Sequence, residues 1–148
     1  MTAKELLNGI IKLRKAIDYR KMKIEMLEAA AESVTAPITG MPHSPSSDPS
    51  AMATAICKKI DLEREVTELT EKRDSLIAQI DLLDNEDYQT LLNLRYAQEE
   101  KWEDIMAAMN YSETHVHRIH RAALASFDEI LKDGSKWQYL AVNGSLRL

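Results

Sequence analysis

Residues 102–121 read WEDIMAAMNYSETHVHRIHR, and this stretch decides the predicted fold. Its apolar residues stand where two helices that meet at a turn must bury them: Ile105, Met109, Tyr111, Val116 and Ile119. Asn110 occupies the expected corner, because Asn tolerates a left-handed backbone better than most residues. Ser112 follows as an N-cap whose hydroxyl can accept from free backbone N–H groups. The pattern predicts a helix-turn-helix.

The second helix of this motif suits the major groove of DNA. From Thr114 to Phe127 it contains two arginines and three histidines but no acid. Steps of 100° per residue turn Val116, Ile119 and Ala123 toward the core and the basic residues outward. The predicted DNA-contacting residues are Ser112, Thr114, His115, His117, Arg118 and Arg121.

Each of these residues has an expected role and an alternative. Arg118 is the candidate for a bidentate contact with guanine. Thr114 and His115 are placed for base edges, and His117 and Arg121 for phosphates. A packed helix pair that binds no nucleic acid needs the same apolar spacing, so that reading stays open.

The N-terminal part of the chain, residues 1–83, shows two heptad patterns. In residues 3–33 the apolar residues alternate spacings of four and three, with Arg20 at one seam position. The second pattern, from Ala51 to Leu83, is interrupted by Lys59 and Arg73. Two helices of similar length joined by a loop predict an antiparallel coiled-coil hairpin with buried seam charges that fix the register. A dimeric coiled coil has the same periodicity, so both remain possible.

Breaks in the pattern mark the expected boundaries. A Pro-rich loop, residues 35–50, holds all four prolines and forbids a helix there. Asp84 to Asp87 is a polar break that can cap the first helix of a three-helix domain, residues 84–133. The tail, residues 134–148, has no period. We therefore expect an all-α protein.

Composition and charge narrow the function classes. The net charge is −5, which is unusual for a protein that binds DNA by bulk electrostatics. One cysteine, Cys57, excludes an internal disulfide framework and suits a cytoplasmic location. No apolar run is long enough for a membrane span.

The sequence contains no nucleophile motif and no phosphate-binding loop. His117 and His120 lack further ligands at metal spacing, so we expect no enzyme, cofactor or metal.

Two resemblances add to this reading. From Tyr88 onward, LLNLRYAQEEKWEDIMAAM and NYSETHVHRIHRAAL resemble region four of bacterial sigma factors, except that Met106 stands where that pattern has a small residue. The long helix ending in SVTAPITGMPHSPS, the second heptad helix and the sigma-like domain together resemble a family of phage- and prophage-encoded proteins. These are similar to phage late-gene transcriptional regulators of the ArpU/RinA type.

The resemblance implies a sequence-specific DNA-binding transcriptional regulator, an activator that works with host RNA polymerase. The expected partners are double-stranded DNA, that polymerase and a second copy of the chain, as a dimer. A DNA-binding assembly protein, such as a small terminase-like packaging subunit, also combines a helix-turn-helix with oligomerising helices and is the alternative. Promoter-specific binding as a dimer would favour the regulator, and a ring oligomer would favour packaging.

Overall fold

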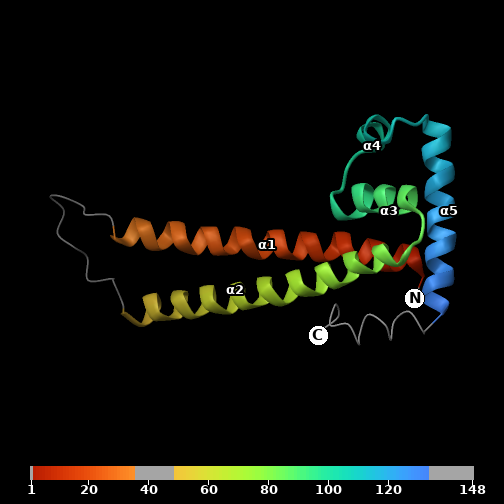
Figure 1. Ribbon diagram of the computed structural model, residues 1–148. Coiled ribbons are helices and arrows are strands. Elements are labelled where there is room, and N and C mark those ends of the chain that lie inside the picture. Colours follow the sequence, from red (N-terminus) through yellow and green to blue (C-terminus); the bar gives the residue numbers. More distant parts are fainter. Residues whose placement is uncertain (1, 36–48, 134–148) are drawn as a thin grey trace. The chain divides into compact units, whose positions relative to one another are not determined.

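The computed structural model describes residues 2–35 and 49–133, and every regular element in these ranges is helical (Figure 1). The elements are α1 (Ala3–Thr35), α2 (Pro49–Ala78), the 3-10 turn η1 (Gln79–Leu82), α3 (Glu86–Leu92), the π-helical turn η2 (Asn93–Ala97), α4 (Trp102–Met109) and α5 (Glu113–Lys132). The predicted all-α class, with a long N-terminal helix, is confirmed. The prediction that residues 35–50 contain no helix is wrong at both ends: Thr35 ends α1, and Pro49 and Ser50 begin α2, because proline is tolerated in the first turn of a helix. Residues 36–48 and the whole tail lie outside the described residues.

The described residues form two compact units, which we name the head and the arm. The arm is one continuous range, Lys15–Thr70. The head contains residues up to Arg14 and those from Glu71 onward. The sequence places a boundary at residue 83, whereas in the structure the first turns of α1 and the last turns of α2 belong with α3, α4 and α5. Each long helix therefore contributes to both units.

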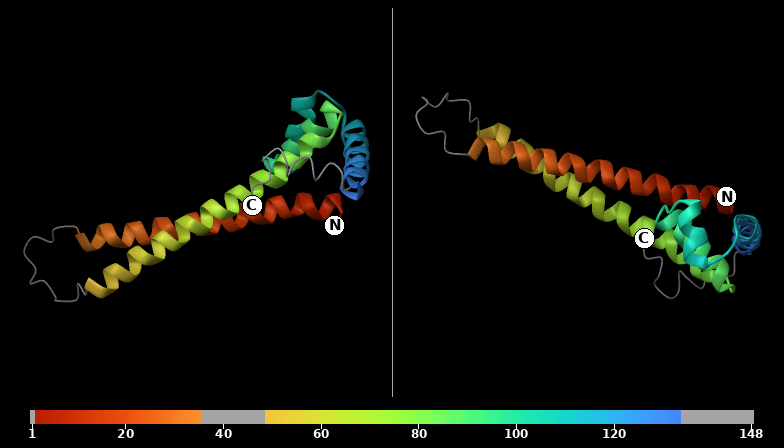
Figure 2. Two further views of the ribbon diagram at one scale, coloured as in Figure 1. Left: turned by 60° about the horizontal axis from the view of Figure 1, so that its bottom comes forward. Right: turned by 90° about the horizontal axis from the view of Figure 1, so that it is seen from above.

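Within the arm, α1 and α2 run antiparallel, which is the arrangement that the sequence predicts (Figure 2). Two ion pairs show the direction: Arg20 pairs with Glu65 at 2.8 Å, and Glu28 pairs with Lys59 at 3.0 Å. As the residue number rises along α1, the partner's number on α2 falls. The two heptad patterns thus meet inside one chain.

The prediction that the seam charges are buried is wrong for these side chains. Arg20, Lys59 and Arg73 keep 30%, 37% and 29% of their side-chain surface exposed. In the arm, a two-helix layer leaves both sides of its seam open, so Arg20 and Lys59 extend their charged ends to carboxylates at its surface. There Lys59 donates to Glu28, and this hydrogen bond raises the pKa of the lysine. Arg73, in the head, keeps its Nε buried without a hydrogen-bond partner.

The head has a single apolar core to which α1 contributes strongly. Leu6, Leu7 and Ile10 are at most 2% exposed. They belong to one cluster with residues of α3, α4 and α5, namely Leu91, Leu92, Ile105, Val116, Ile119, Ala123 and Phe127. Helices of seven and eight residues are too short to enclose a core alone, so the first turns of α1 complete it.

The start of α1 is fixed by two kinds of cap. Thr2 and Glu5 form a capping box: the Glu5 backbone N–H donates to the Thr2 hydroxyl at 3.2 Å, and the Thr2 N–H donates to the Glu5 carboxylate at 3.0 Å. The Ala3 N–H donates to Oδ1 of Asp128, on α5, at 2.6 Å. A carboxylate from α5 therefore satisfies a free N–H at the positive end of the α1 dipole.

Candidate nucleic-acid interface

The corner between α4 and α5 has the predicted left-handed backbone. Asn110 has φ 58° and ψ 44°, and its N–H donates to the carbonyl of Met106. The Tyr111 N–H donates to the same carbonyl at 3.2 Å. These bonds close α4 and let the chain reverse within three residues, so the prediction for Asn110 is confirmed.

The start of α5 is capped as predicted. Ser112 is extended, with φ −70° and ψ 162°, and its hydroxyl accepts from the His115 N–H at 3.3 Å. The Ser112 carbonyl accepts from the Val116 N–H at 2.9 Å, which is the first turn of the helix. The direction in which α5 leaves the turn is therefore set by local hydrogen bonds.

The inner face of α5 consists of Val116, Ile119, Ala123 and Phe127, which are at most 7% exposed. The opposite face carries Thr114, Arg118 and Arg121, all exposed. These three residues lie within about 60° of one another around the helix, because their spacings of four and three nearly complete whole turns. Burial of the apolar face thus turns both guanidinium groups toward solvent.

His115 is half-buried beside the turn. Its ring meets the Tyr111 ring edge to face, with centroids 4.4 Å apart. The Tyr111 hydroxyl donates to Asp87 Oδ2, in the first turn of α3, at 3.1 Å, and this bond raises the pKa of the tyrosine. His115 is therefore held at the start of α5, with part of its ring open to solvent.

His117 packs on Trp102, with ring centroids 4.6 Å apart. Its Nε2 lies 3.9 Å from the Glu113 carboxylate, a pairing that exists only when the imidazole is protonated. The sequence predicts that His117 lies beside the base-reading residues and contacts phosphates. The structure places it half-buried at the edge of the exposed stripe of Thr114, Arg118 and Arg121, about 40° around the helix from Arg121.

Sequence reasoning missed the group around Trp102, which we call the Trp102 cluster: Arg95, Tyr96, Trp102, His117 and His120. The Arg95 guanidinium lies 4.6 Å from the centre of the Trp102 ring, a cation–π contact, and donates to the Glu100 carbonyl at 3.0 Å. His120 meets the indole edge on, at 5.0 Å. The cluster ties η2, α4 and α5 together.

Within this cluster, burial shifts the pKa of Tyr96 and that of His120 in opposite directions. The Tyr96 hydroxyl lies 2.8 Å from His120 Nε2. Burial lowers the pKa of His120, and the nearby charges of His117, Arg95 and Lys4 lower it further. Burial also raises the pKa of Tyr96, against a smaller opposing effect of Arg95. Both shifts favour the neutral form of the side chain, in which the tyrosine hydroxyl can donate to the imidazole nitrogen. His120 is thus engaged by Tyr96, and no group of three metal-ligating side chains occurs among the described residues.

The comparisons with known proteins give one match. Residues 51–128, more than half of the chain, match the family model described as "Protein of unknown function (DUF1492)". The chain belongs to this family. No curated protein and no solved structure matches it. The DUF1492 segment contains most of α2, all of α3 and α4, and α5 as far as Asp128. It therefore includes all six predicted contact residues and the Trp102 cluster.

The charges of the DUF1492 segment are arranged so that α5 offers free donors. Arg118 and Arg121 have no hydrogen bond or ion pair within the described parts of the chain. Several acids precede α5 in the sequence: Glu99, in a left-handed conformation with φ 53°, pairs with Arg14 at 3.0 Å. Glu103 and Asp104 lie in the first turn of α4, where the helix dipole favours acids.

Among the described helices, none has the length and apolarity of a membrane span.

Proposed function

We propose that this protein is a sequence-specific DNA-binding transcriptional regulator that reads the major groove with α5. The observation that carries the proposal is the outward stripe of α5. Two exposed guanidinium groups without intramolecular partners project from a helix that a buried face, an N-cap and a left-handed corner hold in place. Rigid placement lowers the conformational cost of binding, and unpaired guanidinium groups are the side chains that bind guanine and phosphate best.

The position of each side chain along α5 suggests its role. The N-terminal residues of a recognition helix reach base edges. Thr114 and Arg118 are therefore assigned to bases, with Arg118 donating two hydrogen bonds to guanine O6 and N7. Arg121, one turn further along, is assigned to the phosphate backbone. Ser112 and His115, at the start of the helix, lie where a phosphate or a neighbouring base edge would approach.

The second part of the proposal concerns the partner. The resemblance to sigma region four and to phage late-gene regulators supports an activator of phage or prophage origin that works with host RNA polymerase. Within the structure, the support is indirect: few free cations face outward on α5, and the chain is acidic overall. A protein whose sequence-independent electrostatic attraction to DNA is weak needs a second source of affinity. A polymerase partner would supply it.

A binding-site selection with the full chain tests the proposal. The selected duplex is then titrated by fluorescence anisotropy with the wild type, Arg118→Ala and Lys132→Ala, at one salt concentration. Arg118→Ala should weaken binding by about 1–3 kcal/mol, or roughly 5- to 150-fold, and relax the preference at one base pair. Lys132→Ala is the matched control, because it removes an exposed cation from the last turn of the same helix.

Two results would overturn the proposal. One is a selection that enriches no sequence. The other is an Arg118→Ala protein with unchanged affinity for the selected site and the circular dichroism of the wild type. An equal loss of affinity for Lys132→Ala would also count against base reading, because it would show that only overall charge matters.

A further inference from the structure

The exposed large hydrophobic side chains of the described residues all lie in the arm. None of them is among the described residues of the head, whose large apolar side chains are buried or half-buried. They are Tyr19, Met22 and Met26 on α1, and Met52, Ile56 and Ile60 on α2, each with 41–63% of its surface exposed. Single exposed apolar residues need no explanation, and Met52 and Ile56 line a separate groove of the arm. Tyr19, Met22 and Met26, in contrast, follow one another along one side of α1 and form a patch that another molecule can cover.

The seam of the arm is also poorly covered. Ile17, the first seam residue of the arm, is 1% exposed, but Ile24, Leu27, Leu62 and Leu69, further along the seam, are only half-buried. Two helices have no third element to close the sides of their seam. The arm is therefore half of a layered helical structure, since stable bundles enclose such a seam with further helices.

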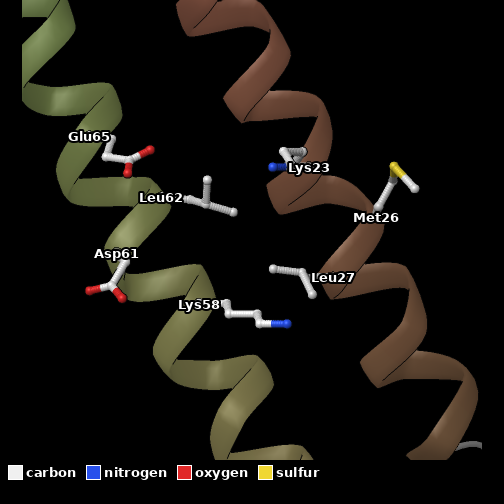
Figure 3. Close-up of a pocket in the computed structure, with 7 residues that line it drawn as sticks. All are labelled: Lys23, Met26, Leu27, Lys58, Asp61, Leu62 and Glu65. Carbon is white, nitrogen blue, oxygen red and sulfur yellow. The ribbon is translucent and has the colours of Figure 1, made fainter.

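A groove of about 570 Å³ opens along one side of the arm. Leu27 and Leu62 point toward each other across it (Figure 3). Met26 lines the same groove and is also the last member of the stripe Tyr19, Met22, Met26, whose spacing of three and four keeps one side of α1 apolar. We name these five residues the arm face.

We propose that the arm face is an interface with a second copy of this chain. The rim of the groove carries two lysines, Lys23 and Lys58, and two carboxylates, Asp61 and Glu65. In a two-fold interface a patch meets its own copy, so a patch of one sign would repel itself. This patch carries both signs around an apolar floor, and its carboxylates already pair within the chain, Glu65 with Arg20 and Asp61 with Arg64. Two copies of such a mixed patch can meet without the repulsion that a patch of one sign would cause.

The size of the surface fits a weak to moderate dimer. About 20 residues per helix give a length of about 30 Å, and two helices side by side are about 20 Å wide. The resulting face of about 600 Å² per chain is somewhat smaller than the ~800 Å² of a standard interface. Pairing two such layers gives a four-helix bundle that covers the half-buried leucines. The inference is independent of DNA binding.

Sedimentation equilibrium of the full chain without DNA tests this inference. The wild type should be dimeric in the micromolar range, between about 1 and 100 µM, as expected for an interface of this size. The double variant Met22→Glu/Met26→Glu should dissociate at least about tenfold more readily, because the dimer would bury unpaired carboxylates. Asn8→Glu/Gln98→Glu adds the same charge at exposed positions of the head and is the matched control.

A spin label on Cys57 supplies a second readout without any engineered cysteine. Cys57 is the only cysteine of the chain and is exposed on α2 of the arm. The wild type and the control should show a defined distance between two labels, and the Met22→Glu/Met26→Glu protein should show none. A wild type that stays monomeric over the whole range would refute the inference. So would a folded double variant that dimerises as tightly as the wild type.

Discussion

Truncation of Leu7 to alanine tests whether the first turns of α1 belong to the core of the head. Leu7 is fully buried in the cluster that includes Leu91 and Phe127. The three carbons that the substitution removes are worth about 0.8 kcal/mol each on transfer from water, or about 2.4 kcal/mol together. The cavity that remains adds to this loss, so we expect destabilisation of about 3–4 kcal/mol.

Urea unfolding followed by Trp102 fluorescence measures this effect. The chain has two tryptophans, so the experiment uses a Trp137→Phe background in which emission reports on the head alone. With a typical slope of about 1–3 kcal/mol per molar urea, Leu7→Ala should lower the midpoint by about 1–4 M. Asn8→Ala changes the adjacent exposed residue and should shift the unfolding free energy by no more than about 0.5 kcal/mol.

Equal midpoints for Leu7→Ala and Asn8→Ala would refute the placement of α1 in the head core. The expected outcome has a consequence for experiments on DNA binding. A fragment that begins at residue 84 would lack Leu6, Leu7 and Ile10, and would expose the apolar residues that they cover. Weak DNA binding by that fragment would then reflect unfolding, so the full chain is the proper material.

Substitutions at three further positions test the local structure by thermal or urea unfolding. Gly9→Ala should stabilise the protein by about 0.4–1 kcal/mol, since the new Cβ would lie 3.9 Å from Leu76 Cδ1, an ordinary contact; a lower melting temperature would contradict the geometry. Asn110→Ala should cost about 1–2 kcal/mol because of the left-handed corner, whereas Asn110→Gly should be nearly neutral; equal losses would exclude the backbone as the cause. Because burial lowers the pKa of His120, its contribution to stability is full above the ordinary value of 6.5 and is lost as the pH falls through the lowered pKa. His120→Gln should therefore flatten the decline in unfolding free energy between about pH 7 and pH 5, and an unchanged slope would exclude His120 as its source.

The helix-turn-helix could be predicted because its determinants are local. A left-handed corner selects Asn110 through its own backbone, and Ser112 caps α5 through a bond to a residue three positions away. The 100° step then separates the buried residues of α5 from the exposed ones without reference to the rest of the fold. Patterns of this kind can be read wherever one helix or one turn determines the outcome.

The extent of the head and the Trp102 cluster could not be predicted, for a different reason. A heptad pattern shows that Leu6 and Ile10 are buried but not which element buries them, and here α3 and α5 take part as well as α2. The cluster joins side chains from η2, α4 and α5 through ring contacts that depend on tertiary placement. Arg95 and Trp102 lie in the stretches that resemble sigma region four, but spacing alone assigns them no contact.

The acidity of the chain and its proposed binding to DNA are compatible because of where the acids lie. Repulsion from phosphates falls off over about 10 Å at moderate salt, so distant acids matter little. Arg14 compensates Glu99, and Glu113 lies beside His117 at the edge of α5. The outward stripe itself contains no acid near Arg118 and Arg121.

Because few free cations face outward on α5, the sequence-independent electrostatic attraction to DNA would be weak, and a larger share of the binding energy would come from base contacts. Affinity would then have to be raised by joining two heads, since the second contact becomes intramolecular once the first is made. A dimeric arm would supply that link, and this is the point at which the two proposals support each other.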